Sequence, residues 1–179
     1  PMYEEDTQEK VIYINTFSKS LVPSLRISYM VMPHKLLQKY IDTQSFYSCT
    51  VSSFEQYALA KFIADGYFER HINRMKNYYR EQRTLVLNAI KNSSLNKIST
   101  VIERNAGTHF LLKIKTDMNN KQVFSAGIER DMQLSFYSDY SYAKSDNQGV
   151  CTLVFNYAGI ARDKIEEVIH RLESIFIQD

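Results

Sequence analysis

The stretch that decides the fold runs from Val11 to Pro33 and reads VIYINTFSKSLVPSLRISYMVMP. Two apolar runs rich in β-branched and aromatic residues, at positions 11–14 and 27–32, flank a polar segment that contains serine, threonine and proline. Strand-forming residues on either side of turn-forming residues predict two neighbouring antiparallel strands joined by a loop. A loop held between two buried strands is a suitable place to fix a reactive side chain.

Four polar residues of this loop form a candidate site, namely Thr16, Ser18, Lys19 and Arg26. An amine, two hydroxyls and a guanidinium suit an aldehyde that also carries a phosphate group. Lys19 would form an imine with the aldehyde, and Thr16, Ser18 and Arg26 would hold the phosphate. A loop lysine beside serines is more often a solvated surface residue, so the spacing alone is weak evidence for this chemistry.

Composition and charge limit the function classes. The chain has 179 residues, of which 44% are hydrophobic, and this is enough for one sizeable core or a core with an appendage. The 22 Lys and Arg are scattered among 20 Asp and Glu, so no basic stripe suited to nucleic acid stands out. No apolar run approaches the ~20 residues that a transmembrane helix needs, and no signal-peptide pattern opens the chain. We therefore expect a cytoplasmic protein that does not contact a membrane.

The two cysteines, Cys49 and Cys151, lie far apart and have no second cysteine or histidine at a metal-ligand spacing. We expect two free, buried thiols in a reducing compartment, and no metal site.

Apolar residues at helical spacing follow the loop region. They predict helices at residues 34–46, 53–64 and 67–91, with Ser52 and Glu55 as a capping box and Gly66 as a C-terminal stop. From residue 97 the pattern changes to strands at 98–102, 108–114, 133–137 and 150–157, with helices at 119–130 and 161–177 and a polar loop at 138–149. This order predicts an α+β layer in which helices cover one side of a small antiparallel sheet.

The loop between the two predicted strands, which contains Lys19 and which we call the lysine loop, resembles the lysine motif of fold-type-I pyridoxal-phosphate (PLP) enzymes. The resemblance is to its form in MocR-type regulators of the GntR superfamily in particular. Those regulators join a winged-helix DNA-binding head to an aminotransferase-like body. The family pattern is roughly hydrophobic-Y-x-x-T-F-S-K-x-L-x-P-x-x-R-x-x-Y, and it is matched here by Tyr13, Thr16, Phe17, Ser18, Lys19, Leu21, Pro23, Arg26 and Tyr29. Further matches are Phe54-Glu55-Gln56, Gly66, the R-H-I-x-R-M run at 70–75, Tyr79, Arg83, the A-G-x-H-like run at 106–110 and the run at 137–140.

The resemblance implies the C-terminal part of a fold-type-I aminotransferase-like domain, of class α+β. It would contain two strands of the large-domain sheet, a long connecting helix and an α+β small domain. The implied domains are a remnant of the large domain at 1–47, connecting helices at 48–95 and the small domain at 96–179.

The resemblance also implies a cofactor and partners. PLP would be held as an imine on Lys19 of the intact parent, with Arg26 at the phosphate-arginine position, and would be largely absent from this chain by itself. The parent would be a homodimer that binds DNA only through an N-terminal winged-helix head outside this chain. Its effector would be a small amine or an amino-acid-like molecule.

One departure from the family pattern bears on activity. Many aminotransferases carry an arginine in the strand before the last helix, where it grips the substrate carboxylate, and this chain has Val154 at that position. Transaminase activity is therefore doubtful, and we expect a regulator rather than a working class I/II aminotransferase, which is the alternative. A third alternative is a dimerisation scaffold without cofactor.

Other polar residues of interest have less specific signals. His71 is expected to serve helix packing or an interdomain contact, and His109 to be a satisfied, partly buried histidine. Tyr137, Tyr140 and Tyr142 would be able to line a pocket, but the chain has 13 tyrosines.

Overall fold

The structure is a computed structural model that describes residues 4–102, 107–141 and 149–177. The chain divides into two compact units, Pro1–Met75 and Lys76–Asp179, which we call the first and the second unit. Their boundary lies within helix α3 (Tyr67–Asn92), so the start of α3 belongs to the first unit and the rest to the second. The three-part domain division with boundaries at 47 and 95 stays a prediction.

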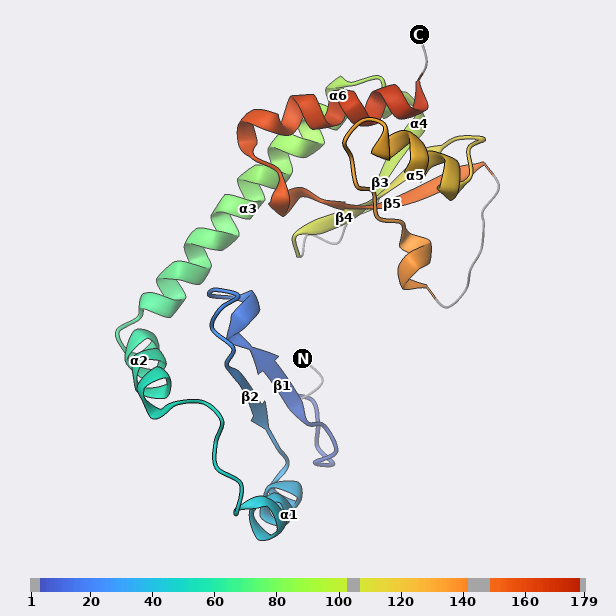
Figure 1. The fold of residues 1–179 in the computed structure, drawn as a ribbon. Coiled ribbons are helices and arrows are strands. Elements are labelled where there is room, and N and C mark those ends of the chain that lie inside the picture. Colours follow the sequence, from blue (N-terminus) through green and yellow to red (C-terminus); the bar gives the residue numbers. More distant parts are fainter. Residues whose placement is uncertain (1–3, 103–106, 142–148, 178–179) are drawn as a thin grey trace. The chain divides into compact units, whose positions relative to one another are not determined.

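The first unit contains the predicted strand–loop–strand (Figure 1). Strands β1 (Tyr13–Thr16) and β2 (Ser28–Val31) pair antiparallel, with Tyr13 opposite Val31. The prediction of two neighbouring antiparallel strands is confirmed, but β1 begins two residues later than expected.

The late start of β1 has a local cause in the preceding turn. The carboxylate of Asp6 accepts hydrogen bonds from the backbone N–H groups of Gln8, Lys10 and Val11, at 3.1, 2.7 and 2.7 Å. These bonds, that from Val11 first, hold the pKa of Asp6 below its ordinary value. Because the Val11 N–H is used in this turn, the strand pairing begins only at Tyr13.

Helices α1 (His34–Gln44) and α2 (Ser53–Ala64) complete the first unit with the start of α3. The Ser52 hydroxyl oxygen accepts from the Glu55 N–H at 3.3 Å, as a capping residue should. Gly66 ends α2 with φ +73°, a conformation that L side chains rarely adopt, so its predicted role as a stop is confirmed. Neither α1 nor α2 has a buried residue, and both expose large apolar side chains: Leu36, Leu37, Tyr40 and Ile41 on α1, and Phe54, Tyr57 and Ile63 on α2.

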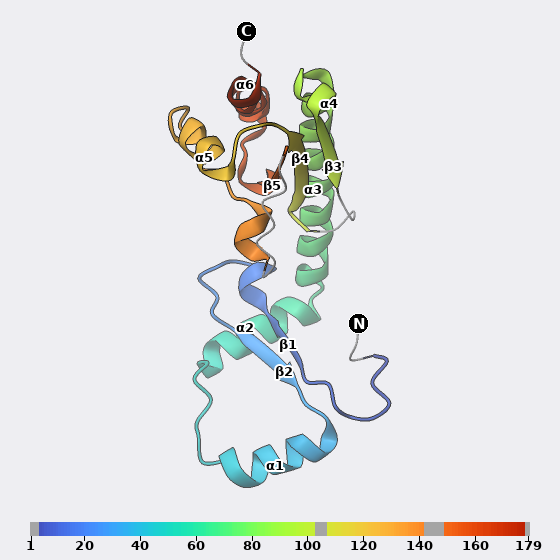
Figure 2. The same ribbon diagram turned by 90° about the vertical axis from the view of Figure 1, so that its right-hand side faces the viewer.

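The second unit is built on a three-stranded antiparallel sheet in the order β3-β4-β5. The strands are β3 (Ser99–Ile102), β4 (His109–Lys115) and β5 (Val150–Asn156). Helices α4 (Leu95–Ile98), α5 (Asn120–Ile128) and α6 (Ile165–Phe176) accompany the sheet together with the second part of α3 (Figure 2). The α+β layer expected from the alternating pattern is confirmed.

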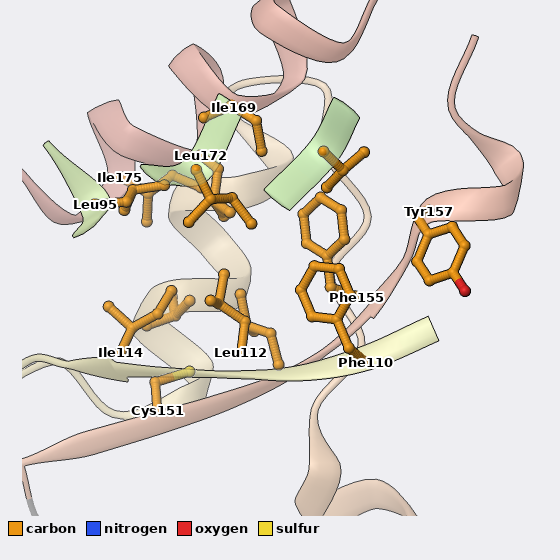
Figure 3. Close-up of a cluster of buried hydrophobic side chains, with 14 of the residues drawn as sticks. Leu95, Phe110, Leu112, Ile114, Cys151, Phe155, Tyr157, Ile169, Leu172 and Ile175 are labelled. Atoms are coloured by element: carbon orange, nitrogen blue, oxygen red, sulfur yellow. The ribbon is translucent and has the colours of Figure 1, made fainter. Parts of the chain in front are cut away.

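The core of this unit lies on one face of the sheet. Alternation along β4 and β5 places six buried side chains on that face: Phe110, Leu112, Ile114, Cys151, Leu153 and Phe155. Figure 3 shows several of them facing Ile169, Leu172 and Ile175 of α6. The rings of Phe110 and Phe155 stack with centroids 5.1 Å apart. Val86 and Ile90 of α3 and Val123 of α5 complete the cluster.

The strand predicted at residues 133–137 is wrong. Only Phe136 forms a bridge, with Leu153 of β5, and the chain then enters the short 3-10 helix η2 (Tyr137–Tyr140). The Asp139 carboxylate accepts from the Phe136 N–H at 3.2 Å, and this bond closes the turn after a single bridge. The closing helix also begins later than predicted, since a 3-10 turn, η4 (Arg162–Lys164), precedes α6.

The two cysteines are free, as expected, but only Cys151 is buried. Cys49 is exposed, because it lies in the polar segment between α1 and α2 and not on an apolar face. Burial raises the pKa of the Cys151 thiol to about 12, so it stays protonated at neutral pH.

Thiol titration of the native chain at pH 8 should therefore find one reactive cysteine. A disulfide reagent should label Cys49 within minutes and Cys151 only when denaturant is added, since the thiolate is the reacting form. The Cys49→Ser variant is the control and should show almost no labelling while folded. Rapid labelling of native Cys151 would contradict the burial described here.

Candidate functional site

Hydrogen bonds of Thr16 and Phe17 close the lysine loop at the ends of its two strands. Its hydroxyl donates to the Ile27 carbonyl at 3.1 Å and its oxygen accepts from the Ser18 N–H at 3.2 Å. The Phe17 N–H also donates to the Ile27 carbonyl, at 2.9 Å. Residues Phe17–Lys19 form the 3-10 turn η1, so Lys19 lies in a turn of defined conformation.

A second set of bonds joins the two arms of the loop. The Ser18 hydroxyl donates to the Leu25 carbonyl at 2.5 Å. Ser18 immediately precedes Lys19 and Leu25 immediately precedes Arg26, so this bond joins the two arms of the loop that carry the cationic side chains. Lys19 and Arg26 are both exposed, and within the described residues neither has a hydrogen-bond or ion-pair partner.

Two exposed cations on the joined arms of one closed loop suit a small anion. Arginine binds phosphate with two parallel hydrogen bonds, and a lysine amine reacts with aldehydes. Lys19 and Arg26 thus meet the requirements of a molecule with an aldehyde and a phosphate group.

Unlike Lys19 and Arg26, Thr16 and Ser18 already use their side chains in hydrogen bonds within the loop. Each hydroxyl has one proton, and in this structure both protons are directed at backbone carbonyls. Phosphate oxygens only accept at neutral pH, so a phosphate contact would require either hydroxyl to release its carbonyl. The role of Thr16 and Ser18 as phosphate ligands stays a prediction, and their observed contacts shape the loop.

Aromatic rings and one histidine support the loop. The Phe17 ring lies 5.4 Å from the Tyr29 ring and 5.7 Å from the Phe68 ring of α3, measured between centroids. His71, also on α3, is half-buried and its Nε2 lies 3.1 Å from the Ser20 carbonyl oxygen. Helix packing was expected of His71, but its partner was not, because 51 positions separate it from Ser20.

The other candidates lie in the second unit. Val154 is half-buried on the sheet face opposite the core, where it pairs with Leu111, and Leu111 pairs with Ile102. No cation lies in this apolar row. His109 is exposed, so the expectation of a partly buried histidine is wrong. Phe110 faces the core, and strand alternation turns its neighbour outward.

The remaining candidates give little. Tyr137 and Tyr140 are exposed on η2, and Tyr142 lies outside the described residues. Within residues 4–102, 107–141 and 149–177, no group of three or more His, Cys, Asp or Glu is placed to hold a metal ion. In the same ranges, no helix is long and apolar enough to cross a bilayer.

Known proteins are similar to this chain over almost its full length. The chain is 34% identical over 169 residues to the uncharacterized HTH-type transcriptional regulator YdeL of Bacillus subtilis, covering 94% of this chain and 36% of YdeL. It is 31% identical over 172 residues to the probable rhizopine catabolism regulatory protein MocR of Rhizobium meliloti, covering 96% of this chain and 34% of that protein. The chain is related to the MocR-type regulators. It spans about a third of the length of these relatives.

A solved structure places the fold of this chain among aminotransferases. The kynurenine aminotransferase of Pyrococcus horikoshii, crystallised in complex with PMP, superimposes with a TM-score of 0.74 at 27% identity, over 96% of this chain and 41% of the enzyme. No protein-family model matches the chain. The predicted fold class, part of a fold-type-I aminotransferase-like domain, is confirmed.

Proposed function

We propose that this chain is part of the effector domain of a MocR-type transcriptional regulator and that Lys19 carries PLP as an imine in the whole protein. The observation that supports this most is the pair of exposed cations, Lys19 and Arg26. They lack partners within the described residues and lie on the two loop arms that the Ser18–Leu25 hydrogen bond joins. PLP has an aldehyde for the amine and a phosphate for the guanidinium.

Each of the four candidate residues then has a defined role. Lys19 supplies the amine and Arg26 binds the phosphate through its planar guanidinium. Thr16 and Ser18 hold the turn that directs Lys19, through their bonds to the Ile27 and Leu25 carbonyls. When bound, PLP supplies an electrophilic carbon that discriminates primary amines from other small molecules.

The effector in this proposal is a small amine or an amino-acid-like molecule. Such a ligand would compete with the Lys19 amine for the aldehyde of PLP, and Lys19, once released, would favour a different conformation of the domain. DNA is contacted by a winged-helix head outside this chain, in keeping with the names of the HTH-type relatives. The protein then works in the cytoplasm, where it reaches its operator.

The whole protein is proposed to be a homodimer. Helices α1 and α2 expose apolar side chains along their length and contribute no buried residue. Groups of exposed large apolar side chains often mark an interaction site in stable proteins. By itself, this chain is expected to hold PLP weakly, since imine formation is reversible and affinity depends on non-covalent contacts beyond Lys19 and Arg26.

A working class I/II aminotransferase is the second candidate, favoured by the 27% identity to a kynurenine aminotransferase. Val154 argues against it. A valine side chain has no hydrogen-bond donor for a substrate carboxylate, and Val154 lies in an apolar row with Leu111 and Ile102.

Three measurements on the full-length protein separate these functions. Titration with PLP should produce the visible absorption of an imine, and added amine should change the affinity for operator DNA. Keto acid formation from amino acid donors should stay far below the ~1 s⁻¹ at which ordinary enzymes begin. Turnover at enzymatic rates would favour the aminotransferase, and an absent imine band would favour a scaffold without cofactor.

A further inference from the structure

Helix α3 contacts the lysine loop through two side chains near its start. The Phe68 ring meets the Phe17 ring edge-on, with centroids 5.7 Å apart and planes at 74°. His71 follows three residues later, which places it on the same side of the helix. Its Nε2 lies 3.1 Å from the Ser20 carbonyl oxygen, and all of these residues belong to the first unit.

The chemistry of this contact fixes the location of one proton. A backbone carbonyl oxygen only accepts hydrogen bonds, so the His71 Nε2 must carry the hydrogen. His71 is half-buried, whereas Arg70 and Arg74 beside it are exposed. The imidazole is therefore the polar group that α3 presents to the loop at this point.

The contact falls at a sensitive position of the loop. Ser20 is the residue after Lys19, and its N–H donates to the Phe17 carbonyl at 3.1 Å. Ser18, the residue before Lys19, is held by its hydroxyl bond to Leu25. The backbone is thus tethered on both sides of Lys19, while the Lys19 side chain stays exposed.

We propose that His71 is a positioning residue for Lys19: by holding the Ser20 carbonyl, it fixes the direction in which the lysine side chain leaves the loop. The inference rests on the proposed function only for what Lys19 reacts with. A reacting amine whose backbone is already fixed loses less freedom when the imine forms, so the contact strengthens cofactor binding.

Two amide variants separate the hydrogen bond from general packing. In His71→Gln the side-chain N–H₂ group reaches about as far from the backbone as the imidazole Nε2. In His71→Asn the same amide is one methylene shorter and falls short of the Ser20 oxygen. His34→Gln, which changes an exposed histidine of α1, controls for loss of an imidazole elsewhere in the first unit.

The first test measures the dissociation constant for PLP in the full-length protein, under conditions where circular dichroism shows each variant folded. His71→Asn should raise this constant about tenfold, as expected for the loss of one hydrogen bond near the reacting group. His71→Gln and His34→Gln should stay within about twofold of the parent. Equal constants for the Gln and Asn variants would overturn the proposal.

A second measurement does not depend on cofactor. Amide hydrogen exchange at Ser20 and Leu21 should be about tenfold faster in His71→Asn than in His71→Gln, because the loop loses its tether. Unchanged exchange in His71→Asn would overturn the role of His71. Absence of PLP binding by the parent protein would instead refute the proposed function, so the two failures are distinguishable.

Discussion

Replacing Lys19 by alanine in the full-length protein should abolish the visible imine absorption on addition of PLP. The reason is that Lys19 is the amine of the T-F-S-K loop, exposed and unpaired within the described residues, with Arg26 on the other arm of the same loop. Loss of the covalent link leaves only the non-covalent contacts, such as that of Arg26 with the phosphate. The dissociation constant for PLP should therefore rise at least about a hundredfold, equivalent to ~3 kcal/mol.

The matched control is Lys35→Ala, which removes an exposed lysine from the first turn of α1 in the same unit. It should leave both the absorption band and the dissociation constant unchanged. Arg26→Ala should keep the band but weaken binding about tenfold or more, because a charge-assisted phosphate contact is lost. A full imine band in Lys19→Ala would show that another lysine carries the cofactor.

The second large effect concerns stability. Leu172→Ala should lower the free energy of unfolding of the second unit by about 2–5 kcal/mol, as is usual when a fully buried leucine is truncated. Leu172 is 0% exposed and lies among Leu112, Ile114 and Ile175 in the core between α6 and the sheet (Figure 3). Its removal leaves a cavity that the tightly packed neighbours fill only in part.

Urea denaturation followed by circular dichroism measures this change, with Leu85→Ala as the control. Leu85 is on α3 within the same unit but is 44% exposed, so its truncation should cost less than about 1 kcal/mol. Equal losses for Leu85→Ala and Leu172→Ala would contradict the packing of α6 on the sheet.

Most of the fold could be predicted from local sequence patterns. Helix α2 is found at its predicted bounds, Ser53–Ala64. The residues that set its two ends, Ser52 and Gly66, lie within a few residues of those ends in the sequence. The strand at 133–137 was mispredicted because the Asp139 cap ends the pairing after Phe136, and β-rich composition alone does not reveal such a turn. The exposure of His109 could be predicted from the alternation along β4: because Phe110 faces the core, its neighbour His109 faces outward.

Only those residues of the candidate site that lie close together in the sequence could be predicted. Lys19 and Arg26 belong to one motif, so they were recognised together. The contact of His71 with Ser20 joins positions 51 apart, and only the tertiary structure brings them into contact. The engagement of the Thr16 and Ser18 hydroxyls with carbonyls likewise depends on the register of β1 and β2.

The most direct test of the central claim is borohydride reduction of the PLP-loaded full-length protein, followed by peptide mapping with mass spectrometry. Reduction converts a reversible imine into a stable amine and so marks the lysine that carried the cofactor. We expect a phosphopyridoxyl group on Lys19 and on no other lysine. A modified peptide that contains a different lysine, or no modified peptide at all, would contradict the account.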